Sequence, residues 1–135
     1  MAEETYKPTE SMAAEAVRGL AWRKEYNRGG TLVGVARANQ LKNRENLSAS
    51  TVKRMHSYFS RHEVDKQGQG FSPGEPGYPS AGRIAWALWG GDAGQSWARD
   101  KVAGMKSLGT YFDSDLDYYH TMNELEVAAE LLKQS

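Results

Sequence analysis

The side chains best suited to bind a ligand form a row at four-residue spacing: Arg18, Trp22 and Tyr26. Residues four apart lie on the same side of a helix, so one guanidinium and two aromatic rings would line up. Aromatic rings stack on unpaired bases, worth about 1–3 kcal/mol per base, and guanidinium groups bind phosphate. The row therefore predicts a nucleic-acid contact. The alternative is that it packs on a neighbouring helix, with Arg18 merely covering Trp22.

This row lies in a strongly basic part of the chain. Residues 18–61 hold ten basic side chains against two acidic ones, a net charge of +8, although the whole chain has a formal net charge of zero. From residue 110 onward six acidic residues face one lysine, a net charge of −5. A basic surface attracts polyanions, unless the acidic segment folds back and neutralises it. The candidate nucleic-acid-binding residues are Arg18, Trp22, Arg23, Tyr26, Arg28, Arg37, Lys42, Arg44, Lys53, Arg54 and Arg61.

A second candidate surface lies on a helix that begins after Ser48. Leu47 and Val52 flank the Ser48 cap as a hydrophobic staple, and the apolar residues that follow fall on one side of the helix. Basic residues fall on the other side, where we expect solvent and a polyanion: Lys53, Arg54 and Arg61.

The sequence contains no recognisable catalytic or metal-binding signature. The sequence has no phosphate loop with Gly-Lys-Ser/Thr, no dinucleotide fingerprint and no Gly-x-Ser-x-Gly, so we expect a protein that is not an enzyme and uses no cofactor. His56 and His62 are six residues apart and cannot share a metal from one helix, and we expect His62 to be a core histidine. Three alternating aspartates lack the glycine and closing glutamate of a calcium loop: Asp113, Asp115 and Asp117. We therefore predict no metal site.

Helix start and stop signals predict an all-α fold: a compact single-domain bundle of five to six short helices with one long Gly/Pro-rich loop over residues 67–79. We expect Phe71 and Tyr78 to pin this loop to the body. The expected helices cover residues 11–26, 31–41, 48–65 and 81–89, with two more starting near 92 and 121. We expect Thr31, Ser48 and Ser80 to cap the second, third and fourth of them, and the breaker Asn27-Arg28-Gly29-Gly30 to end the first. The first would bury Ala13, Ala16, Val17, Leu20 and Ala21. The predicted organisation is a flexible N-terminus (1–10), a helical module (11–109) and an acidic helical extension (110–135).

Three of the four tryptophans lie between residues 82 and 101, around a Gly-Gly-Asp. They could form a stacking platform, but the segment 81–89 is apolar all round, which favours a buried central helix. Trp86, Trp89 and Trp97 are therefore predicted to form the core. We expect Asp92 to cap the following helix.

Length and composition fit one globular domain. The chain has 135 residues, 39% of them hydrophobic, and no cysteine, which is consistent with a reducing compartment. Its N-terminus lacks the apolar region of a signal peptide, and no run is long enough to span a bilayer, so we expect a soluble protein without a membrane partner.

Three segments occur in an order that resembles a small module recurrent in tailed-bacteriophage proteins, free-standing or attached to proteins of the prohead-protease type. They are RGGTLVGVARANQL, LSASTVKRMHSYFSRHEVDK and GYPSAGRIAWALWGGDAGQSWA, within residues 12–102. The resemblance implies a phage origin and a compact helical unit, and it brings no activity with it.

These observations favour a non-sequence-specific nucleic-acid-binding protein of a phage, with single-stranded DNA as the preferred partner, acting in DNA replication or packaging. The alternative is a structural or head-assembly adaptor protein that works through contacts with phage head or replication proteins, or with further copies of itself. The expected location is the cytoplasm of an infected bacterium, with the virion as the alternative.

Overall fold

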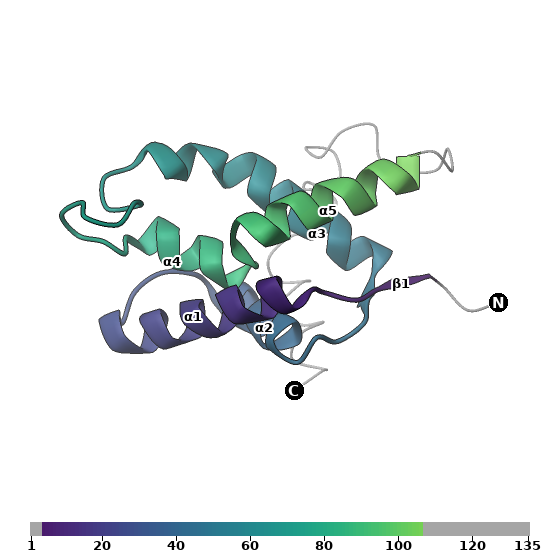
Figure 1. Cartoon of the computed structure of the whole chain (residues 1–135), viewed down its shortest axis with the longest axis horizontal. Coiled ribbons are helices and arrows are strands. Elements are labelled where there is room, and N and C mark those ends of the chain that lie inside the picture. Colours follow the sequence, from purple (N-terminus) through teal and green to yellow (C-terminus); the bar gives the residue numbers. More distant parts are fainter. Residues whose placement is uncertain (1–3, 107–135) are drawn as a thin grey trace.

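The computed structural model describes residues 4–106. The prediction of an all-α fold is confirmed: this part of the chain folds into five α-helices, with one 3-10 helix and one pair of two-residue strands (Figure 1). The expected extension 110–135, with its helix near residue 121, lies outside the described residues. The elements are β1 (Thr5–Tyr6), α1 (Glu10–Tyr26), α2 (Leu32–Lys42), β2 (Leu47–Ser48), α3 (Ala49–His62), η1 (Glu63–Gln67), α4 (Ala81–Leu88) and α5 (Gly91–Lys106).

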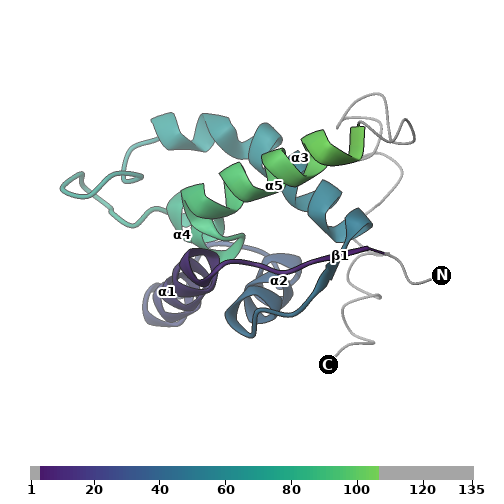
Figure 2. The same ribbon diagram turned by 45° about the vertical axis from the view of Figure 1, so that its right-hand side comes forward.

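The helices pack in two groups with α4 between them. Figures 1 and 2 show α1 and α2 on one side and α3 with α5 on the other. The closest helix pairs are α1 with α2, α1 with α4, and α3 with α5. Because α4 is short and surrounded, nearly all of its side chains must be apolar.

Polar caps fix where the helices begin, as the sequence predicts for three of them. Thr31, Ser48 and Ser80 each accept a hydrogen bond from the backbone N–H three residues later. The first helix begins one residue earlier than expected, at Glu10, and the side chain of Thr9 caps it. Side-chain capping therefore accounts for four of the five helix starts.

The tryptophan core is confirmed. Trp86 and Trp89 on α4 are 1% and 8% exposed, and Trp97 on α5 packs against the same core while partly buried. The ring of Tyr58 stacks on Trp89 with centroids 4.5 Å apart, and Phe59 meets the ring of Trp86 at 4.8 Å. Aromatic rings from α3 and α4 thus hold the two groups of helices together.

The buried face of α1 differs from the predicted one. Met12, Ala16 and Gly19 are buried, whereas Val17 is 47% exposed and Ala21 is also exposed. The cause is the close approach of α4: a Cβ on Gly19 would lie 2.8 Å from the backbone nitrogen of Leu88 and 3.0 Å from the Cβ of Ala87. Helix α1 therefore packs on α4 through Gly19, and the branched side chain of Val17 stays exposed.

Two further predictions, the Asp92 cap and the core position of His62, are wrong. Helix α5 begins at Gly91, so Asp92 lies in its first turn, and its carboxylate accepts a hydrogen bond from the Trp86 indole. His62 is not in the core: its side chain is 37% exposed and its Nδ1 lies 3.1 Å from Oδ2 of Asp65. The helix there stops at residue 62 and continues as η1.

The N-terminal segment, expected to be flexible over residues 1–10, has fixed partners from Thr5 onward. β1 and β2 pair antiparallel, with Thr5 opposite Ser48 and Tyr6 opposite Leu47. Pro8 is fully buried, and its carbonyl accepts a hydrogen bond from Nε of Arg44 at 2.8 Å. A two-residue strand carries too little periodicity to be detected in a sequence.

Candidate nucleic-acid interface

The row predicted on α1 forms a cluster around Trp22. The Arg18 guanidinium lies 4.3 Å from the centre of the Trp22 ring, and that of Arg83 on α4 lies 5.0 Å from it. The ring of Tyr78 meets Trp22 edge to face at 5.6 Å. Arg18 does cover Trp22, as the packing alternative predicts: the indole is half-buried and its neighbours are cationic and aromatic. We call Arg18, Trp22, Tyr78 and Arg83 the arginine–tryptophan cluster.

One carboxylate serves two arginines of this cluster. Oε2 of Glu15 lies 3.3 Å from Nη1 of Arg18, and its Oε1 lies 3.0 Å from Nη2 of Arg83. Arg18 also donates a hydrogen bond to the Tyr78 hydroxyl at 3.0 Å. Two cations share one anion, so the cluster keeps a net positive charge.

The end of α1 adds a further exposed pair. Tyr26 is 41% exposed, and the guanidinium of Arg28 lies 5.4 Å from the centre of its ring. Nη2 of Arg28 donates to the carbonyls of Gly77 and Pro79, at 3.2 and 3.0 Å. These carbonyls are neutral, so the charge of Arg28 is not cancelled by its partners.

The long loop is fastened to the body, as predicted. Phe71 meets the ring of Trp86 edge to face at 6.0 Å, and Tyr78 lies against α1. The backbone N–H of Ser80 donates to the carbonyl of Gly70 at 2.9 Å, which closes the base of the loop. Loop residues therefore hold fixed positions beside the arginine–tryptophan cluster.

Four of the other candidate cations are placed at different parts of the surface. Arg23 donates to the Gly29 carbonyl and supports the turn after α1. Arg44 binds the Pro8 carbonyl and lies 3.7 Å from Glu10. Lys42 and Arg61 are exposed at the ends of α2 and α3. These residues do not join the arginine–tryptophan cluster.

Two candidate residues that were predicted to lie on the surface are buried. Arg37 is fully buried, with its guanidinium 5.3 Å from the Trp89 ring and its Nη1 hydrogen-bonded to Gln40. Arg54 is 8% exposed, although the sequence placed it with half-buried Lys53 on the solvent side of its helix. The reason is that α3 is covered by α5 and by the strand pair, so seven of its fourteen residues are buried. The basic segment 18–61 is thus not one continuous exposed band.

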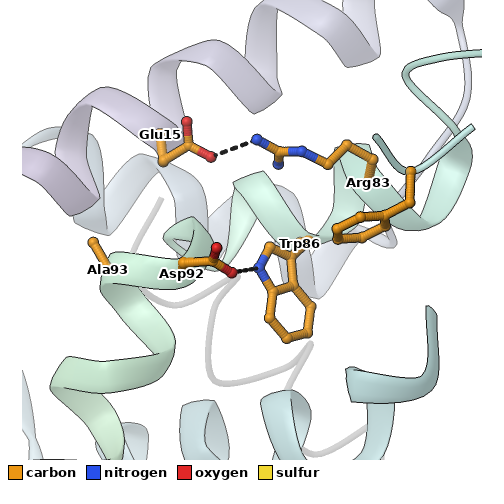
Figure 3. Close-up of a pocket in the computed structure, with 6 residues that line it drawn as sticks. Glu15, Arg83, Trp86, Asp92 and Ala93 are labelled. Atoms are coloured by element: carbon orange, nitrogen blue, oxygen red, sulfur yellow. Dashed lines mark hydrogen bonds and ion pairs between the residues drawn. The ribbon is translucent and has the colours of Figure 1, made fainter. Parts of the chain in front are cut away.

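A pocket of about 280 Å³ opens where α1, α4, α5 and the loop meet. Figure 3 shows Glu15 reaching toward Arg83, and Asp92 toward the indole nitrogen of Trp86. No sequence pattern marks this pocket, because its residues come from four separate segments. Its lining consists of Glu15, Phe71, Arg83, Trp86, Asp92 and Ala93.

The surroundings of Asp92 at this pocket change the pKa of its carboxyl group. Its Oδ1 lies 2.9 Å from Nε1 of Trp86 and 3.1 Å from Nζ of Lys66. Partial burial alone would raise the pKa of the Asp92 carboxyl, but hydrogen bonds from Lys66 and Trp86 lower it, and so do the charges of Lys66 and Arg83. The pKa of Asp92 is therefore below its ordinary value, and the carboxyl is ionised at neutral pH.

Within residues 4–106, no group of three or more His, Cys, Asp or Glu side chains could hold a metal ion. In the same range no helix is long and apolar enough to cross a bilayer. Comparisons of the chain with protein-family models, with curated proteins and with solved structures found no match.

Proposed function

We propose that this protein binds nucleic acid without sequence specificity, with single-stranded DNA as the preferred partner, through the arginine–tryptophan cluster and the adjoining Tyr26 and Arg28. The observation that carries the proposal is the gathering of three guanidinium groups, from Arg18, Arg28 and Arg83, beside three aromatic rings on one face. Cations for phosphates and rings for bases are the two components of a single-strand site.

The exposed parts of this face suit phosphate. The Arg18 side chain is 47% exposed, and Arg28 is exposed while bound to carbonyls. Because the hydrogen-bond partners of Arg28 are neutral carbonyls, its positive charge can still attract an anion. Lys24 is exposed on the same helix but lies two residues from Trp22, on the opposite side, so it is not part of this face. The tightly packed Trp22 lines the site, and the more exposed Tyr26 is the ring available for stacking.

The burial of Arg37 and Arg54 makes the proposed interface smaller than the sequence suggested. About two phosphate contacts, from Arg18 and Arg28, would give a slope near −1.4 for the logarithm of the binding constant against the logarithm of salt concentration. Such a slope is shallow compared with that of large DNA-binding dimers. It is the slope expected of a protein that makes few phosphate contacts.

The test is a fluorescence-anisotropy titration of labelled single-stranded and duplex oligonucleotides at several salt concentrations. Arg18→Ala and Arg28→Ala should each weaken binding and flatten the salt slope. Arg99→Ala on α5, where Arg99 is exposed and lies 4.0 Å from Asp100, is the matched control and should change neither. Tyr26→Ala should weaken single-strand binding more than duplex binding. Absence of binding even at low salt would overturn the proposal.

The phage role in replication or packaging rests on the resemblance of the three sequence segments and is part of the same proposal. A second function, a structural or head-assembly adaptor, is favoured by apolar side chains on the surface: Val17 (47% exposed), Leu32 (77%) and Val64 (63%). The two functions separate after nuclease digestion. A scaffold or adaptor should still self-associate or enter particles, whereas a nucleic-acid-binding protein should not.

A further inference from the structure

We propose that the pocket lined by Glu15, Phe71, Arg83, Trp86, Asp92 and Ala93 receives one unpaired nucleobase that carries an amino group. This inference rests on the proposed function and adds a base preference to it. The ligand class is a single cytosine, adenine or guanine ring, with thymine disfavoured.

The pocket adjoins the proposed phosphate-binding face through one shared residue. The Arg83 guanidinium lies 5.0 Å from the Trp22 ring on the cluster side and 5.8 Å from the Phe71 ring on the pocket side. Glu15 links the same two sides, because its carboxylate binds both Arg18 and Arg83. A strand whose phosphates contact Arg18 would therefore bring a base within reach of the pocket.

The size of the pocket suits one flat ring. Its volume of about 280 Å³ lies just below the range of roughly 300–1,000 Å³ that is typical of pockets for drug-sized ligands. Phe71 supplies an aromatic wall, and Ala93 leaves room beside it. A phosphate group is a poor fit, because the carboxylates of Glu15 and Asp92 would repel it.

The accessible polar group of the pocket is the acceptor on Asp92. Nη2 of Arg83 is held by Glu15 and its Nη1 is buried, so the guanidinium forms a wall of the pocket. The hydrogen bonds of Asp92 from Trp86 and Lys66 both fall on Oδ1, and its side chain is 77% exposed, so Oδ2 can accept another. Base edges present donors that can meet this acceptor.

The acceptor at Asp92 sets the base preference. An ionised carboxylate accepts hydrogen bonds and cannot donate one, so it favours the amino groups of cytosine, adenine and guanine. The pairing edge of thymine has a single N–H between two carbonyl oxygens, which the carboxylate repels. We expect oligo(dC) and oligo(dA) to bind about fivefold more tightly than oligo(dT), the effect of one base-edge contact.

The first experiment uses free nucleosides, which have no phosphate. Deoxycytidine or deoxyadenosine, added to the full chain, should shift the indole N–H resonance of Trp86, which donates to Asp92 at the pocket. Thymidine should shift it only at much higher concentration, and inorganic phosphate should not. A shift with phosphate but not with nucleosides would overturn the inference.

The second experiment compares charge-matched variants on the same helix. Asp92→Asn should abolish the preference for oligo(dC) over oligo(dT), because an amide both accepts and donates. Asp100→Asn removes the same charge from an exposed position of α5 and should leave the preference intact. Equal binding of all three oligonucleotides by the wild-type protein, with normal salt dependence, would overturn the base pocket and leave the proposed function standing. Nucleoside shifts without salt-dependent oligonucleotide binding would overturn the proposed function instead.

Discussion

Nη2 of Arg83 lies 3.0 Å from Oε1 of Glu15, and this ion pair joins α4 to α1 across 68 positions of the sequence. The side chains are 13% and 22% exposed, so water screens the pair little. The same guanidinium lies over the rings of Trp22 and Phe71. One arginine thus ties two helices and the long loop to each other.

Arg83→Met should lower the free energy of unfolding by about 2 kcal/mol, because it leaves Glu15 in a poorly hydrated position with only Arg18 as a partner. Arg99→Met breaks an exposed contact, with side chains 62% and 75% exposed, and should change stability by less than about 0.5 kcal/mol. Urea unfolding measures both, and a double-mutant cycle with Glu15→Gln isolates the pair. Equal effects of the two arginine variants would show that the partly buried ion pair contributes nothing.

Gly19→Ala should destabilise the fold by about 1–3 kcal/mol, although helix propensity alone favours alanine by about 1 kcal/mol. The added Cβ would meet the backbone nitrogen of Leu88 at 2.8 Å, and a backbone atom cannot swing away. The helical Gly104 has no described atom within 4 Å of its Cβ position, so Gly104→Ala is the control and should be neutral or stabilising. Thermal unfolding gives the sign, and a stabilised Gly19→Ala variant would refute the close packing of α1 on α4.

Arg28→Ala should expose the Gly/Pro-rich loop to proteases. The side chain donates to two loop carbonyls, of Gly77 and Pro79, and without it the end of the loop keeps fewer attachments to α1. Limited proteolysis with mass spectrometry should show faster cleavage between residues 68 and 79 than in the wild-type protein. Lys24→Ala, an exposed change on the same helix, should cleave at the wild-type rate. Unchanged cleavage in both variants would mean that Tyr78 and Phe71 hold the loop without Arg28.

Asp92→Asn should destabilise the protein in a pH-dependent way. The folded-state pKa of Asp92 is lowered, so the ionised carboxylate stabilises the fold above its unfolded-state pKa of about 3.9 and loses this effect as pH falls through the folded-state pKa. The stability difference between wild type and variant should be largest near neutral pH and vanish once the pH falls below the folded-state pKa of Asp92. The side chain is 77% exposed, so the difference should stay below about 1 kcal/mol. Chemical denaturation at several pH values measures it, and a difference that grows toward low pH would contradict the assignment.

Local signals in the sequence were sufficient for most of the helices. Thr31, Ser48 and Ser80 cap helices where predicted, because a hydroxyl before a helical run satisfies a backbone N–H whatever the rest of the chain does. Gly29 and Gly30 have φ of +91° and +80°, and they separate α1 from α2 as the breaker motif indicates. The β1–β2 pair was missed because its partners are far apart in the sequence and each strand has only two residues.

The functional surface was predicted less well than the helices. The four-residue spacing of Arg18, Trp22 and Tyr26 correctly placed them on one helix, but it gave no indication of Arg83, Tyr78 or Glu15 beside them. The pocket residues show no shared pattern, because each segment contributes only one or two of them. Residues 18–61 carry a net positive charge, but composition alone does not reveal that Arg37 and Arg54 are buried.

The sequence by itself determined the helical class, the caps at Thr31, Ser48 and Ser80 and the break after α1, since each depends on neighbours within a few turns of chain. It also indicated that Trp86 and Trp89 are buried, because the segment around them is apolar on all sides. Tertiary structure alone decided which arginines are exposed and which are buried, and which face of α1 meets α4. The physical reason is that burial depends on surfaces brought together from distant segments: Trp89 packs on Arg37, and Gly19 admits the backbone of Leu88.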